Sequence, residues 1–306
     1  MPRGIPPEVR SGRPRVGYLG PEGTFTEEAL LASAAAGAVE PCPLGSIYDT
    51  VMALREGQVR WAIVPIENSL EGSISATLDL LVAAGGDVEI VGEALLRVSH
   101  SLIAAEPITL EEIASVTTHP HVPGQCTRFL RGELPNARIL AASSTAEAVR
   151  SVVADGRGDR AALGTLLAAE IYGGTVIRAG VEDRDDNETR FVWLGRAPGG
   201  EPPPLRAGAS GAWKTSLAFW GAGAERPGWL VRCLEQFARR DINLTKIESR
   251  PRREGLGSYV FFADLGGRAG EGPVAEAIAA LRALCEEVRL LGSYPSAAPA
   301  SARPPG

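Results

Sequence analysis

The sequence of 306 residues predicts an α/β protein with two domains. As far as residue 197, short apolar runs such as "RVGYL" and "WAIVPI" alternate with amphipathic segments, which is typical of a largely parallel sheet covered by helices. Residues 213–292 then follow the order strand, helix, strand, strand, helix, strand, which is the ferredoxin-like βαββαβ pattern. Between them, residues 198–212 are rich in Pro, Gly and Ala and predict a linker.

The composition excludes several classes of protein. Hydrophobic residues at 44% and charged residues at 22% are typical of a globular chain, and a net charge of -6 argues against binding to nucleic acid. No run of about 18 apolar residues predicts a membrane span. Residues 1–14 are rich in Pro and Arg and lack the apolar segment of a signal peptide, so we expect a disordered leader and a cytoplasmic protein. Residues 293–306 predict a disordered tail.

The cysteines and histidines do not form a recognisable metal motif. The cysteines lie far apart in the sequence, with no C-x-x-C pair, so neither a metal site nor a disulfide framework is expected. They are Cys42, Cys126, Cys233 and Cys285. The three histidines, His100, His119 and His121, are too few for a convincing metal cluster.

The helices of the first domain have marked starts. Three S/T-x-x-E capping boxes are present, at Thr24 with Glu27, Thr109 with Glu112, and Ser144 with Glu147. The number of elements suggests two sheets, the second over about residues 98–178. Two such lobes would leave a cleft between them, because open α/β sheets bind ligands beyond the carboxyl ends of their strands.

Two polar stretches follow predicted strands. In "GYLGPEGTFTEEAL", Gly17, Gly20 and Gly23 precede a capped helix, and the segment is either an anion site or a tight turn. In "WAIVPIENSLEGS", an apolar strand ends by presenting the polar residues Glu67, Asn68 and Ser69. A binding site is favoured there, although these residues also form good turns.

Two further stretches carry candidate site residues. In "TTHPHVPGQC", His119 lies at a strand end, His121 is expected to be exposed, and Cys126 is expected to be buried rather than nucleophilic. In "NETRFVWLG", Thr189 and Arg190 open a buried strand. On spacing alone, Arg190 either faces a ligand or only reaches solvent and neighbouring acids.

Taken together and in order, "GYLGPEGTFTEEAL", "VPIENSLEGS", "THPHVPGQC", "AALG" and "NETRF" resemble the catalytic domain of the prephenate dehydratases. The segments "INLTKIESRP" and "GSYVFFADLGG" resemble the ACT regulatory domain that follows it in that family. The resemblance covers about residues 15–291. It implies a bilobal catalytic domain, similar to type II periplasmic binding proteins, over residues 15–197 and an ACT domain over 213–292.

The resemblance also implies a reaction and its residues. Prephenate would lose carbon dioxide and a hydroxyl group to give phenylpyruvate for phenylalanine synthesis, with no metal or redox cofactor. Thr189 corresponds to the essential threonine of the family and would be the general acid. Arg190 would hold a substrate carboxylate if it faces the cleft, or brace the strand if it faces away, and Phe191 would pack on the ring. Positions that match the cleft-lining motifs are Glu67, Asn68, Ser69 and His119.

For the second domain, the resemblance implies feedback control by L-phenylalanine at a subunit interface of a homodimer or homotetramer. The matching effector-binding positions are Gly228, Trp229, Leu230, Asn243, Glu248, Ser249, Arg250 and Pro251. The family pattern at the helix start is Gly-Ala-Leu, whereas this chain has Trp229. That tryptophan is expected either to fill the effector pocket and weaken inhibition, or to point into the interface with the sheet.

Two other functions are compatible with the same residues. Arogenate dehydratases carry out the same elimination on an aminated substrate, and no residue of the sequence separates the two substrates. A non-catalytic amino-acid sensor with an ACT module is the alternative from another class, but the presence of Thr189 beside Arg190 favours an enzyme.

Overall fold

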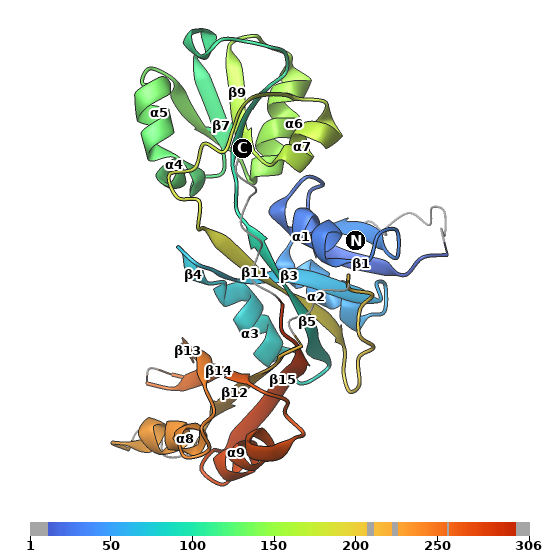
Figure 1. Ribbon diagram of the computed structural model, residues 1–306, viewed down its shortest axis with the longest axis vertical. Helices are drawn as coiled ribbons and strands as arrows, with labels where there is room; N and C mark the ends of the chain where they lie inside the picture. The colour runs from blue at the N-terminus through green and yellow to red at the C-terminus, as the bar shows by residue number, and fades with distance from the viewer. Residues whose placement is uncertain (1–11, 207–210, 222–225, 256, 298–306) are drawn as a thin grey trace.

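The computed structural model describes residues 12–206, 211–221, 226–255 and 257–297 as three bodies stacked along the long axis of the molecule (Figure 1). The first lobe lies in the middle, the second lobe at the top and the C-terminal domain at the bottom. No helix in these described ranges is long and apolar enough to span a membrane.

The first lobe is a sheet with helices on both faces. Its strands lie in the order β5-β11-β3-β1-β2 and have the bounds β1 Arg15–Leu19, β2 Glu40–Leu44, β3 Trp61–Asn68, β5 Val88–Arg97 and β11 Glu188–Arg196. β1 is parallel to β2 and β3, whereas β11 is antiparallel to β3 and β5. The helices are α1 (Phe25–Ser33), α2 (Ile47–Arg55) and α3 (Ser75–Ala83), and the short β4 (Gly72–Ser73) pairs with β3. The fold is therefore α/β, as predicted.

The second lobe is a separate five-stranded sheet in the order β10-β6-β9-β7-β8. Its elements are β6 Ser101–Ala104, a 3-10 turn Leu110–Glu112, β7 Ser115–Thr118, α4 Val122–Gln125, α5 Thr127–Glu133, β8 Arg138–Ala141, α6 Thr145–Asp155, β9 Arg160–Gly164, α7 Leu166–Tyr172 and β10 Thr175–Ala179. The chain passes between the lobes twice, after β5 and before β11 (Figure 1). β11 therefore returns the chain to the centre of the first sheet.

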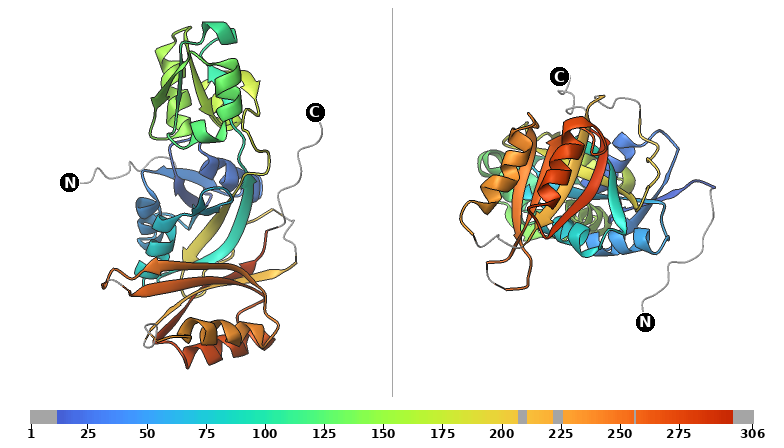
Figure 2. Two further views of the ribbon diagram at one scale, coloured as in Figure 1. Left: turned by 90° about the vertical axis from the view of Figure 1, so that its left-hand side faces the viewer. Right: turned by 90° about the horizontal axis from the view of Figure 1, so that it is seen from below.

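The C-terminal domain has the predicted order of elements. These are β12 Trp213–Trp220, α8 Trp229–Ala238, β13 Leu244–Pro251, β14 Tyr259–Gly266, α9 Gly272–Arg282 and β15 Glu287–Pro295, with the strands in the order β13-β14-β12-β15. Both helices cover the face turned away from the first and second lobes, so the other face of the sheet lies toward the first lobe (Figure 2). Alternating residues of β12 and β14 pack into two cores, one on each face.

The sheets of the first lobe and the C-terminal domain are joined. β15 pairs with β5 at Gly292 and Ile90, and a Cβ atom at position 292 would lie 2.2 Å from the Ile90 carbonyl oxygen. Only glycine fits this close approach. Side chains of both bodies also share one apolar core, which includes Ile90, Trp220 and Phe262. The two bodies therefore have a packed interface rather than a flexible tether.

Two predicted boundaries need correction. Residues 293–295 belong to β15 rather than to a disordered tail, and Tyr294 has no exposed surface because it is buried between the two bodies. The predicted linker is packed along the first lobe over part of its length: Trp61 Nε1 donates to the Glu201 carbonyl at 2.8 Å, and Ala34 bridges to Leu205. Residues 1–11, 207–210 and 298–306 of the predicted leader, linker and tail lie outside the described residues.

The cysteines include one pair that the sequence does not reveal. Cys233 and Cys285 are 52 positions apart, yet their sulfur atoms lie 3.8 Å from each other in the helix-covered core of the C-terminal domain. Both are free thiols. Sequence spacing does not exclude such contacts, because the packing of α8 against α9 brings distant positions into one core.

Candidate active site

The candidate site is built on the paired strands β3 and β11. Thr189 lies opposite Asn68, and Arg190 lies opposite Glu67. Successive side chains of a strand point to opposite faces, so these two pairs must face in opposite directions. Thr189 and Asn68 lie toward the junction of the lobes, whereas Arg190 and Glu67 lie toward the C-terminal domain.

The side chain of Asn68 orients the hydroxyl group of Thr189. Asn68 Oδ1 accepts hydrogen bonds from the amides of Leu70 and Glu71 at 2.9 and 3.0 Å, which fixes the amide so that Nδ2 faces β11. Nδ2 then donates to Thr189 Oγ1 at 2.9 Å and to Asn187 Oδ1 at 2.8 Å. Because Thr189 Oγ1 accepts this bond, its own proton is free for another acceptor.

The hydrogen-bond chain continues into the second lobe. Asn187 Nδ2 donates to Gln125 Oε1 at 3.1 Å, and Gln125 Nε2 donates to Glu71 Oε1 at 2.8 Å. Gln125 ends α4 of the second lobe, whereas Glu71 follows β3 of the first. Asn187, Gln125 and Glu71 are not among the site residues that the sequence predicts. The one sequence signal for Asn187 is its position two residues before Thr189 in "NETRF".

His100 also joins this chain, although it was not selected as a site residue. Its Nε2 lies 3.1 Å from Gln125 Oε1, an oxygen that can only accept, so Nε2 carries the proton. Nδ1 is buried without a partner in the described structure. Burial lowers the pKa of His100, although Gln125 and the carboxylates of Glu182 and Glu71 oppose this shift. His100 is therefore held neutral.

The depressed pKa of His100 predicts a pH dependence of stability. Below the ordinary histidine pKa of about 6.5, the unfolded chain binds a proton that the folded chain resists, so the contribution of His100 to stability is lost as the pH falls. We expect the free energy of unfolding in urea to decrease between about pH 7 and 5 more steeply for the wild type than for His100→Gln. Equal slopes would show that another group governs acid unfolding.

Ser69 and the two motif histidines lie around the same chain. Ser69 Oγ donates to Asn187 Oδ1 at 3.3 Å and accepts from the Glu188 amide at 3.0 Å. His121 is exposed, with Nδ1 2.8 Å from Glu71 Oε2, and its ring centroid lies 5.2 Å from that of the half-buried His119. Burial, and then the neighbouring His121, lower the pKa of His119.

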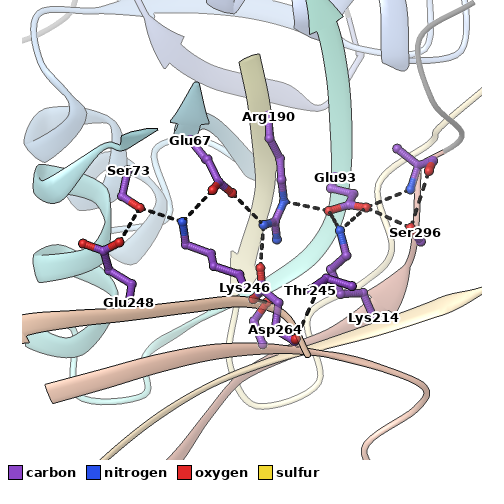
Figure 3. Close-up of polar contacts among 12 residues, drawn as sticks. Glu67, Ser73, Glu93, Arg190, Lys214, Thr245, Lys246, Glu248, Asp264 and Ser296 are labelled. Carbon is purple, nitrogen blue, oxygen red and sulfur yellow. Dashed lines mark hydrogen bonds and ion pairs between the residues drawn. The ribbon is translucent and has the colours of Figure 1, made fainter. Parts of the chain in front are cut away.

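Arg190 does not have the orientation required of a substrate clamp beside Thr189. Its Nε donates to Glu93 at 2.8 Å and its NH1 to Asp264 at 2.5 Å (Figure 3). Its NH2 donates to the Tyr294 hydroxyl at 2.8 Å. Asp264 and Tyr294 belong to the C-terminal domain. Arg190 therefore faces away from the cleft, which was the second of its two predicted orientations. It braces its own strand and also binds the C-terminal domain.

Glu67 is likewise directed to the C-terminal domain rather than to the lobe junction. Its carboxylate lies 2.9 Å from Lys246 Nζ and 3.5 Å from Arg190 NH1. Lys214 Nζ in turn binds both carboxylate oxygens of Glu93, at 2.9 and 2.8 Å. Figure 3 shows these side chains as a row of alternating charge between the two bodies. Such a row satisfies charges that would be costly if they were buried alone.

Phe191 also differs from its expected role. A bulge between Arg190 and Phe191 shifts the register against β3, and the ring is 1% exposed in the core under α1. It packs there with Tyr18 and Trp193. Phe191 therefore stabilises the first lobe and is not positioned to cover a substrate ring.

The glycine loop before α1 forms a turn and a contact between the lobes. The Gly23 amide donates to Glu27 Oε2 at 2.6 Å, and its carbonyl accepts from Thr165 Oγ1 at 2.7 Å. Gly23 has φ +82°, and a Cβ atom there would lie 2.8 Å from Ala168 Cα. These contacts support the tight-turn interpretation of the loop, because the Gly23 amide is already used.

The predicted effector residues divide between the two faces of the C-terminal sheet. Gly228 caps α8 with φ +79°, and Trp229 is buried in the core under the helices, where its Nε1 donates to the Leu284 carbonyl. Leu230 is partly buried beside it. On β13, Glu248 contacts Ser73 and Arg250 contacts Asp79 on the opposite, lobe-facing side, while Asn243, Ser249 and Pro251 are exposed. The predicted effector residues therefore do not form a single site within one chain.

The contact between Asn68 and Thr189 leads to a testable prediction. Asn68→Asp replaces the donating amide by a carboxylate, which would accept the threonine proton and hold it away from a substrate. We expect kcat to fall by about 10²-fold or more with a smaller change in KM. Ser151→Asp, on an exposed face of α6, is the matched control and should leave kcat unchanged. Wild-type kcat in Asn68→Asp would contradict the proposed orientation.

Comparison with known proteins agrees with this arrangement. The family model described as prephenate dehydratase matches residues 16–199. A prephenate dehydratase from Mycobacterium sp. (strain JLS) is 43% identical over 302 residues, which span 95% of this chain and 92% of that protein.

Solved structures of related proteins superpose on most of this chain. A prephenate dehydratase from Arthrobacter aurescens, solved in complex with L-Phe, superposes with a TM-score of 0.81 at 36% identity and covers 92% of this chain and 89% of that one. GqqA, described as a novel type of quorum quenching acylase, has a TM-score of 0.80 at 28% identity and covers 92% of this chain and 98% of its own. By the family model and by identity over most of its length, the chain belongs to the prephenate dehydratase family of carbon–oxygen lyases, which convert prephenate to phenylpyruvate.

Proposed function

We propose that Thr189 is the general acid of the decarboxylative dehydration of prephenate. The hydrogen bond from Asn68 Nδ2 to Thr189 Oγ1 carries this proposal, because it leaves the hydroxyl proton free and supports negative charge on the oxygen once the proton has left. A threonine hydroxyl is a weak acid, but the departing hydroxide is about as basic as its conjugate base, so a concerted transfer can be near thermoneutral.

The bond between the ring carbon and its carboxylate breaks, and its electron pair enters the ring as carbon dioxide leaves. The bond to the ring hydroxyl breaks at the same time, and the hydroxyl takes the proton of Thr189 to leave as water. The threonine oxygen then regains a proton from water. Ser69 and His119 are proposed to contact the substrate beside Thr189, because they share its side of the lobe junction.

The fold also bears on how substrate reaches Thr189. We propose that the two lobes, which the chain crosses between twice, form a catalytic domain similar to type II periplasmic binding proteins. Hydrogen bonds from Gln125 and Thr165 already connect the lobes in this structure. We therefore propose that substrate entry separates Gln125 from Glu71 and that closure restores their contact.

An activity assay tests the function directly. The purified chain is incubated with prephenate, and phenylpyruvate is followed by its absorbance, with arogenate assayed in parallel. We expect a higher kcat/KM for prephenate. A higher value for arogenate would make the protein an arogenate dehydratase, and no turnover of either substrate would favour a non-catalytic sensor. The assay is needed because similar folds can carry other activities, as the relative described as an acylase illustrates.

We also propose that residues 213–295 form an ACT domain that binds L-phenylalanine between subunits of a homodimer or homotetramer. The βαββαβ order supports this, as does the related Arthrobacter aurescens enzyme that was solved with L-Phe. Trp229 lies in the core of its own domain, so the basis for expecting weakened inhibition is absent. Light scattering and inhibition assays with L-phenylalanine test the proposal. A monomer that L-phenylalanine does not inhibit would contradict it.

A further inference from the structure

A cavity of about 840 Å³ lies between the first lobe and the C-terminal domain. Residues of α2 and α3 form one side, and residues of β12, β13 and β14 form the other. The cavity borders neither Thr189 nor Asn68, and it does not include Gly228, Trp229 or Leu230. It is therefore separate from the candidate active site and from the start of α8, although Arg250 and Pro251 of β13, two of the predicted effector positions, line it. Its volume is in the usual range for small-molecule sites.

The floor and walls of the cavity are apolar and partly aromatic. Trp220 and Phe262 come from the C-terminal sheet, Tyr48 from α2 and Leu80 from α3. Tyr48 is 58% exposed, although it borders a largely apolar space. A flat apolar group of metabolite size can pack between these side chains without leaving a polar group unsatisfied.

Four arginines line the same cavity, against two acids, so its lining carries a formal excess of two positive charges. The arginines are Arg250, Arg252, Arg253 and Arg289, and the acids are Asp79 and Glu254. Asp79 is shared, since Arg253 lies 2.7 Å and Arg250 3.3 Å from its Oδ2. Glu254 is already paired with Arg252 at 2.9 Å. The arginines are engaged as well, but each guanidinium has five N–H donors, so a carboxylate can still find one, whereas an ammonium group would compete with arginines for both acids.

We infer that this cavity binds a small aromatic carboxylate that lacks an amino group, such as an aryl-substituted 2-oxo or propionic acid. The ring packs on Phe262 and Leu80, and the carboxylate is held by Arg250 and Arg253 in competition with Asp79. This assignment depends on the charges and shape of the cavity and not on the proposed function.

The cavity is also at one end of a row of contacts made by β13. Arg250 binds Asp79, Glu248 accepts from Ser73 Oγ at 3.0 Å, and Lys246 binds Glu67. Glu67 in turn contacts Arg190, the residue that follows Thr189. A ligand that binds Arg250 would weaken its ion pair with Asp79. This ion pair is the first in a row of contacts that ends at Arg190, beside the candidate general acid Thr189.

Calorimetric titration of the full chain with 3-phenylpropionate, and separately with L-phenylalanine, tests the inference. Ala76 lines the cavity at an exposed position of α3, so Ala76→Trp fills the space without disturbing a core. Arg253→Gln removes a guanidinium from a side chain that is 78% exposed. The matched controls are Ala154→Trp and Arg138→Gln, at exposed positions of the second lobe.

We expect 3-phenylpropionate to bind the wild type and both controls alike, and to bind Ala76→Trp and Arg253→Gln at least tenfold more weakly. Thermal melting checks that all four variants are folded. Absence of binding to the wild type would overturn the inference. Binding that Ala76→Trp leaves unchanged would place the ligand elsewhere, including at Thr189, and would overturn it as well. If only L-phenylalanine binds in a manner sensitive to Ala76→Trp, the assigned ligand class is wrong.

Discussion

Thr189→Ala should lower kcat for phenylpyruvate formation by about 10²–10⁴-fold, the usual contribution of a general acid. The hydroxyl that Asn68 orients is lost, and the departing hydroxide must then take its proton from water. KM should change much less, because the missing interaction develops mainly in the transition state. Steady-state kinetics with prephenate give both constants.

Two further variants separate chemistry from packing. Thr189→Ser keeps the hydroxyl and should recover much of the lost rate. Thr215→Ala removes a buried threonine of the C-terminal domain whose hydroxyl donates to the Gly267 carbonyl at 2.8 Å, and it should cost about 1 kcal/mol of stability without loss of kcat. If Thr189→Ala turned over at nearly the wild-type rate, Thr189 would not be the general acid.

Arg190→Met should destabilise the protein by about 3–5 kcal/mol, because it leaves the buried carboxylate of Asp264 without its counter-charge and leaves Glu93 with Lys214 alone. The Arg190 side chain is 9% exposed, and the carboxylates it binds on Glu93 and Asp264 are 1% and 7% exposed. Burial lowers the pKa of Arg190, but the Tyr294 hydroxyl oxygen and the carboxylates of Asp264 and Glu93 outweigh it and hold the pKa above its ordinary value. Urea unfolding and thermal melting measure the loss.

The matched control is Arg184→Met. Arg184 also pairs with a carboxylate, Asp186 at 2.7 Å, but both side chains are more than half exposed, so we expect no measurable change in stability. A double variant, Arg190→Met with Asp264→Leu, should be less destabilised than the sum of its single variants, because the unpaired carboxylate is gone. Additive losses would mean that the two side chains do not act as a pair.

Arg190→Met should also lower activity, since Arg190 and Thr189 are consecutive residues of β11. The expected effect on kcat is smaller than that of Thr189→Ala, because Asn68 continues to orient the hydroxyl. Arg190 is thus a positioning residue in this structure, and its variants should change stability more than chemistry. A loss of kcat without any loss of stability would instead indicate that Arg190 contacts the substrate.

The sequence by itself determined the α/β class and the βαββαβ order of the second domain, and the resemblance of its ordered motifs to the family selected Thr189 and Asn68 as candidates. These follow from local patterns: apolar periodicity specifies elements, capping residues mark helix starts, and short motifs keep their order along the chain. The sequence does not decide between the effector pocket and the sheet interface for Trp229. Its helical spacing identifies a buried face but not the residues that pack against that face.

Only the tertiary structure decided where Arg190, Glu67 and Phe191 point. Strand alternation places Thr189 and Phe191 on one face of β11 and Arg190 on the other, but it does not reveal that α1 covers Phe191 or that the C-terminal domain meets Arg190. The partners of Arg190 are distant in sequence: Asp264 is 74 positions away and Tyr294 is 104. Tyr294 also lies beyond the boundary predicted for the domain. Local composition cannot report a buried charge network, because its stability comes from pairing between segments that meet only in the folded chain.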